Sequence, residues 1–169
     1  MRIRLTEVLS ALSLTTDLGA GVPFEKGLRT CVVASAFGSA VSLPLDEQRS
    51  VFHAALLRSI GCTAHAPENA AMFGDDMRFQ RALKELDPAD WETFSVRFGE
   101  WDKARQPELL GVLVEETPTT GVYAARSGCE VSAALGARLG IEPGAISALG
   151  HVLSAGMVRA FPMAARGTT

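Results

Sequence analysis

Four side chains that could bind a metal ion lie close together in the sequence. They begin with His65 and Glu68, which are three residues apart and can share one helix face. Asp75 and Asp76 follow after a short segment. Imidazole and carboxylate groups together hold divalent ions, such as manganese, iron or magnesium, that activate water for phosphate hydrolysis. The alternative is structural, because Glu68 can support the helix dipole while the two aspartates cap or turn the chain.

Few other residues offer such chemistry. Pro67 disfavours helical geometry at the residue before it, which favours a position for His65 outside the helix. His53 and His151 could act as distant ligands, but neither has a partner nearby in the sequence, and His151 can instead satisfy a backbone carbonyl. The three cysteines form no C-x-x-C pair and predict reduced, mostly buried thiols. The chain has no serine or cysteine nucleophile motif and no phosphate-binding glycine loop.

The segments that carry these residues are predicted to be helical, and no segment alternates with the period of a strand. The predicted class is therefore all-α, a compact multi-helix bundle. We expect helices at 6–17, 23–41, 46–60, 67–73, 77–86, 88–101, 107–116 and 118–139, and a last one from Pro143. The helix at 23–41 is predicted to be central to the core, because its small residues allow a neighbour to approach closely. Asp46 is predicted to be the N-cap of the next helix, at 46–60.

Length and composition indicate one soluble domain. The 169 residues, 47% hydrophobic and 21% charged, suffice for one core, so we expect a single domain at 1–162 and a disordered tail at 163–169. The net charge of −3 gives no reason to expect nucleic acid as a partner. Glu7 interrupts the apolar N-terminal stretch and argues against a targeting signal, while the apolar stretch 143–158 is too short to span a membrane. We expect a cytoplasmic protein with no membrane partner.

One apolar stretch resembles a known signature. Ala55-Leu56-Leu57 followed by Ile60-Gly61 is similar to the "A-L-L-H-D-I-G" motif of the HD and HD-GYP phosphohydrolase superfamily. Further stretches resemble, in matching order, a bacterial HD-GYP-like subfamily often fused to a helix-turn-helix domain. They are 9–19, 25–31, 61–68, 73–76, 129–140 and 150–152. The resemblance implies an HD-like helical fold.

The catalytic residues of that family do not carry over. The resemblance implies a metal-binding His in an early helix, where this chain has Lys26 or Gly27, and a His-Asp pair where it has Arg58-Ser59. Gly128 stands where relatives often have His, and the Gly-Tyr-Pro-like turn is missing after the stretch 150–152. A cation in place of a ligand repels the metal that it should bind. The resemblance therefore suggests a degenerate family member, either naturally shortened or cut from a longer one, in which catalysis is not expected.

Two functions are compatible with these residues. The first is a non-catalytic HD-like module, without a cofactor, that senses a ligand or associates with a regulatory protein or a second copy of itself in a bacterial regulatory system. In it, Lys26 and Arg58 would point into the former metal cleft and bind the phosphate or carboxylate of an anionic small molecule. Alternatively, both cations lie on solvated helix faces or pair with nearby carboxylates. The second function is a metal-dependent phosphohydrolase that uses the rearranged cluster at 65–76.

Overall fold

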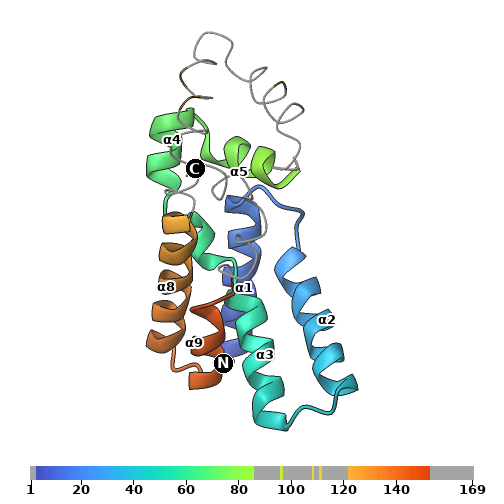
Figure 1. Ribbon diagram of the computed structural model, residues 1–169. Coiled ribbons are helices and arrows are strands. Elements are labelled where there is room, and N and C mark those ends of the chain that lie inside the picture. Colours follow the sequence, from blue (N-terminus) through green and yellow to red (C-terminus); the bar gives the residue numbers. More distant parts are fainter. Residues whose placement is uncertain (1–2, 86–95, 97–107, 109–110, 112–121, 153–169) are drawn as a thin grey trace, which may run out of the picture.

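The computed structural model describes residues 3–85, 96, 108, 111 and 122–152, and the elements within them are helices (Figure 1). They are α1 (Leu5–Gly19), α2 (Lys26–Ala40), α3 (Leu45–Leu57), the 3₁₀ helix η1 (Ile60–Thr63), α4 (Ala66–Phe73), α5 (Asp76–Glu85), α8 (Val122–Arg138) and α9 (Pro143–Leu149). The predicted all-α bundle is confirmed for this part of the chain. The predicted helices at 88–101 and 107–116, the domain limit at 162 and the tail at 163–169 lie outside the described residues. None of the described helices combines the length and the apolar character needed to span a bilayer.

Helix α3 lies at the centre of the bundle. It packs against α2 and α1 on one side and against α9 on the other, while η1 continues the chain onto α8 (Figure 1). Leu56 and Leu57, at the end of α3, are almost fully buried because helices cover both of these sides. The buried core consists of Leu9, Cys31, Ala55, Leu56, Leu57, Ile141, Ala145 and Leu149. The apolar residues of the stretch that resembles the HD signature, Ala55-Leu56-Leu57, thus lie in the core and hold the bundle together.

Helix α2 lies at one edge of the bundle, so its predicted central position is wrong (Figure 1). Cys31 and Gly38 are buried, but Val33 and Phe37 are 69% and 67% exposed. The small residues do allow close packing, but only along one narrow face. No described residue covers the other face.

Local signals placed several helix ends correctly, but α2 begins at Lys26 rather than at Pro23, and α3 ends at Leu57 rather than at Ile60. Gly74 directly follows α4 and Gly140 lies two residues after the end of α8, with φ values of 80° and 70°, a conformation that glycine adopts without a steric penalty. Pro143 begins α9, as predicted. The predicted N-cap at Asp46 is wrong, because α3 already begins at Leu45 and its N-cap is Pro44. Asp46 instead lies in the first turn, where its negative charge favours the helix dipole.

Candidate functional site

Arg58 lies at the C-terminal end of α3, against the first turn of α2. Its Nη2 donates a long hydrogen bond of 3.4 Å to the Thr30 hydroxyl, which in turn donates to the Lys26 carbonyl at 2.8 Å. Lys26 and Thr30 are one helical turn apart, so Arg58 contacts the turn of α2 that begins at Lys26, but the contact to Lys26 is with its backbone carbonyl. The Lys26 side chain is exposed, whereas that of Arg58 is partly buried. Thr30, which connects them, was not predicted.

The guanidinium of Arg58 is incompletely satisfied. Its Nε atom is buried, and no residue in the described part of the chain accepts a hydrogen bond from it. A buried donor without an acceptor costs about 1–3 kcal/mol, and more when the group is charged. A carboxylate or phosphate oxygen could accept from Nε and Nη2 together, because the guanidinium presents parallel N–H groups. The guanidinium therefore retains a buried donor that no described residue uses.

Asp17 holds the first turn of α2 in place from α1. Its Oδ2 accepts a hydrogen bond from the backbone N–H of Gly27 at 3.0 Å, and its side chain is almost completely buried. The N-cap of α2, Glu25, has a φ of 67° and makes no side-chain cap, so Asp17 takes over this role from another helix. A Cβ at Gly27 would overlap the Ser13 hydroxyl. Lys26 or Gly27 stands where the resemblance implies a His, and a side chain at position 27 would require the Ser13 hydroxyl to move.

The backbones of η1 and α8 lie very close to each other at Gly61 and Gly128. The N–H of Gly61 donates to the Ser132 hydroxyl at 3.0 Å, and both residues are buried. A Cβ at Gly61 would overlap the backbone carbonyl of Gly128, and one at Gly128 would lie only 3.1 Å from the carbonyl oxygen of Gly61. Position 128 is the other place where relatives often have His. Backbone atoms fill the space next to it.

The two predicted aspartate ligands are engaged in local structure. Asp75 accepts a hydrogen bond from the backbone N–H of Arg78 at 3.0 Å, which caps the start of α5. Asp76 is buried and accepts from the Asn69 side chain at 2.8 Å, which links α5 to α4. Glu68 is exposed in the first turn of α4. These contacts match the structural alternative for the three carboxylates.

His65 is the N-cap residue of α4 and lies outside the helix, as Pro67 predicted. Its ring faces Tyr123 of α8, with 6.2 Å between the ring centroids. Its Nε2 is buried, and no described residue is within hydrogen-bonding distance of it. Within 3–85 and 122–152, no group of three or more His, Cys, Asp or Glu side chains is arranged to hold a metal ion. The structure therefore does not bring the four predicted ligands together, and Arg58 contacts a different helix from His65.

The other two histidines have partners. His53 Nδ1 lies 2.7 Å from Glu142 Oε2, a contact between α3 and the start of α9 that spans 89 residues of sequence. Burial raises the pKa of Glu142, but hydrogen bonds from its own backbone and from His53, with attraction to His53 and Arg49, outweigh it and lower that pKa below the ordinary value. His151 Nδ1 lies 2.9 Å from the Ser147 carbonyl, which confirms the structural prediction for His151.

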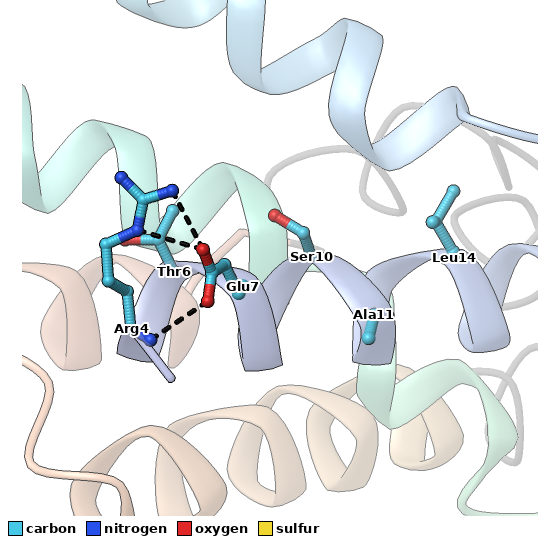
Figure 2. Close-up of a pocket in the computed structure, with 6 residues that line it drawn as sticks. All are labelled: Arg4, Thr6, Glu7, Ser10, Ala11 and Leu14. Carbon is cyan, nitrogen blue, oxygen red and sulfur yellow. Dashed lines mark hydrogen bonds and ion pairs between the residues drawn. The ribbon is translucent and has the colours of Figure 1, made fainter. Parts of the chain in front are cut away.

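Arg58 lines neither of two open hollows found on the described surface. The larger, about 540 Å³, runs along α1, where Arg4 contacts Glu7 through two hydrogen bonds of 2.8 and 2.9 Å (Figure 2). Hydrogen bonds from the backbone and side chain of Arg4 lower the pKa of Glu7. The smaller, about 350 Å³, is lined by Thr6, Ser35, Gln48, Arg49, Phe52 and His53. In both hollows the charged groups are already paired or face solvent.

Comparison with known proteins shows a partial similarity. The chain is 28% identical over 83 residues to 3'3'-cGAMP-specific phosphodiesterase 3 of Vibrio cholerae serotype O1 (strain ATCC 39315 / El Tor Inaba N16961). The match covers 48% of this chain but only 18% of the phosphodiesterase. No family model matches the chain, and no solved structure is significantly similar to it. The similarity therefore concerns a part of each protein.

Proposed function

We propose that this chain is a non-catalytic, HD-like helical module that binds an anionic small molecule at Arg58, as the sensing part of a bacterial regulatory system. The observation that carries the proposal is the buried Nε of Arg58, for which no described residue provides an acceptor. An anion at this point would satisfy that donor and compensate for the charge. Thr30 and the exposed Lys26 lie beside the same turn and would extend the site.

The residues at the expected ligand positions support the proposed loss of metal-dependent catalysis. Arg58 stands where the HD signature has its His, and a cation repels a divalent ion. A Cβ at Gly27 would overlap the Ser13 hydroxyl, and one at Gly128 would lie 3.1 Å from the Gly61 carbonyl oxygen, so an imidazole at either position would require the neighbouring atoms to move. Side chains that bind an anion have thus taken the place of side chains that bind a metal.

The partial relative suggests a class of ligand. Its name states that it acts on 3'3'-cGAMP, a cyclic dinucleotide with two phosphate groups, and we propose a phosphate-bearing ligand of this class. Isothermal titration calorimetry with 3'3'-cGAMP, and with inorganic phosphate as the minimal probe, tests it. We expect Arg58→Ala to weaken binding about 10- to 100-fold, since hydrogen bonds to a charged group contribute about 1.5–3 kcal/mol. Arg58→Lys keeps the charge but loses the paired N–H groups, so a part of the affinity should remain.

Arg126→Ala is the matched control, because Arg126 is an exposed arginine on α8, which lies across the bundle from α2 (Figure 1). It removes the same charge from the protein and should leave the affinity unchanged. Binding that Arg58→Ala does not weaken, or weakens only as much as Arg126→Ala does, would refute the site. Absence of binding to both probes would refute the proposed ligand class.

A metal-dependent phosphohydrolase is the second candidate function. The similarity to a phosphodiesterase favours it, as does the buried Nε2 of His65, which has no partner among the described residues. Metal analysis of protein purified without chelators, followed by an assay of 3'3'-cGAMP hydrolysis with manganese, distinguishes the two functions. Stoichiometric metal and turnover that both disappear in His65→Ala would establish the enzyme. Their absence from the parent protein would leave the binding module.

A further inference from the structure

One face of α2 is apolar and exposed over its whole length. We call it the α2 apolar face, and it consists of Val32, Val33, Ala36, Phe37, Ala40 and Val41, with Leu45 at the start of α3. Val32 and Val33 are each 69% exposed, Phe37 is 67% exposed and Leu45 is 74% exposed. The segment 30–45 contains no charged residue. Water therefore contacts a continuous hydrocarbon surface with no charge inside it.

The exposed area of the α2 apolar face is large enough for a small protein–protein interface. A large apolar side chain presents roughly 150–200 Å² when fully exposed, so five that are half to three-quarters exposed offer roughly 500 Å². Two alanines add to this area. Two such faces in contact bury roughly 1,000 Å², which is where specific protein interfaces begin. Exposed apolar patches at the upper end of the range for monomers usually mark interaction sites.

The charges at the two ends of the face are opposite. At the N-terminal end of α2, Lys26 and Arg29 are exposed, and Glu25 pairs with Arg29 at 3.6 Å, which leaves a net positive charge. At the other end, Asp46 and Glu47 are exposed in the first turn of α3. A basic end and an acidic end on one face are self-complementary when a second copy runs in the opposite direction. A parallel arrangement would bring like charges together.

We propose that two copies of this chain pair through the α2 apolar face, with the two α2 helices antiparallel about a two-fold axis near Ala36 and Phe37. In this arrangement Val32 contacts the partner's Val41, because residues that lie equally far from the axis along the two antiparallel helices are opposite each other. Ala36 and Ala40 let the two helices approach closely. Arg29 then lies near the acidic start of α3 in the other copy.

This inference does not depend on the anion site. Arg58 packs on the inner side of the first turn of α2, whereas the α2 apolar face points away from the bundle. Loss of ligand binding in Arg58→Ala and loss of self-association in a variant of Phe37 are therefore separate results. Either can fail while the other holds.

Sedimentation velocity of the full chain over a wide range of protein concentration tests the pairing. We expect a monomer–dimer equilibrium for the parent protein and a monomer for Phe37→Asp, with a dissociation constant raised about 100-fold or more, because each dimer loses two central aromatic side chains. Tyr123→Asp on α8 is the matched control, since Tyr123 is 65% exposed, and it should still dimerise. Circular dichroism confirms that both variants fold.

A charge exchange tests the antiparallel direction. Arg29→Glu should weaken the dimer about 5- to 10-fold, and adding Glu47→Arg should restore it, because the opposite charges again face each other across the axis. A parent protein that stays monomeric at every concentration would overturn the proposal. So would dimers of Phe37→Asp as tight as the parent, a Tyr123→Asp variant that dissociates equally, or a charge exchange that restores nothing.

Discussion

The close contact between η1 and α8 leads to the sharpest prediction, for the substitution Gly61→Ala. The added Cβ would overlap the carbonyl of Gly128. Because the obstacle is backbone, it cannot rotate away as a side chain would, and η1 must move off α8. The hydrogen bond from the Gly61 N–H to the Ser132 hydroxyl, 3.0 Å long and buried, is then lost as well.

The expected cost is the sum of these two effects. Forcing an extra carbon into a packed core costs about 1–3 kcal/mol. Leaving a buried N–H without its acceptor costs about 1–3 kcal/mol more. The free energy of unfolding should therefore fall by about 2–6 kcal/mol, which lowers the Tm by about 4–24 °C in a chain of this size. The total free energy of unfolding of natural domains is about 5–15 kcal/mol, so a loss in the upper part of this range would nearly unfold the protein.

Gly136→Ala provides the control, measured by the same urea and thermal denaturation followed by circular dichroism. Gly136, on α8, is buried like Gly61, but a Cβ there would lie 3.5 Å from Leu149 and 3.6 Å from Leu57, which are ordinary contacts. Alanine is favoured over glycine within a helix by about 1 kcal/mol, so this variant should be as stable as the parent or slightly more stable. If Gly61→Ala unfolds at the same urea concentration as the parent, or if Gly136→Ala loses as much stability, the proposed backbone contact is wrong.

Two further predictions concern carboxylates. Asp17→Ala should lower the free energy of unfolding by about 1–3 kcal/mol, because the Gly27 N–H loses its buried acceptor, while Asp17→Asn keeps an acceptor oxygen and should lose less; equal urea midpoints for the two would contradict the capping role. The pKa of Glu142 is lowered by folding, so its stabilising contribution is complete above the ordinary pKa of 4.5 and is lost as the pH falls through the lower, folded value. Glu142→Gln should therefore show a shallower fall in the urea midpoint below pH 4.5 than the parent, and identical slopes would refute the linkage.

The features that the sequence predicted correctly depend on neighbours within a few residues. The ends of α4, α8 and α9 follow from glycine or proline at defined positions, and the position of His65 follows from Pro67. The exposure of α2 could not be predicted in this way. Its apolar residues have the spacing of a buried helix, and only the arrangement of the other helices determines that one face stays uncovered.

The contacts of the candidate site were missed for a similar reason. His53 contacts Glu142, which is 89 residues away in the sequence, and Arg58 contacts Thr30, which is 28 residues away. No local sequence pattern predicts either contact. The resemblance to the HD signature did indicate Arg58 as a residue of interest. The resemblance did not indicate Thr30, because the family pattern specifies metal ligands and the hydrogen bond between Arg58 and Thr30 involves no metal ligand.

Packing bears on whether a metal site of the HD type could be restored at these positions by one substitution. A site of the HD type needs space between helices for ions and their water, and imidazoles that reach into that space. Here the space beside Gly27 is filled by Ser13, and the space beside Gly128 by the backbone of Gly61. An imidazole at position 128 would require η1 to shift slightly away from α8, next to the buried hydrogen bond from Gly61 to Ser132. The close packing at these glycines therefore supports the proposal that the metal site of the HD type has been lost.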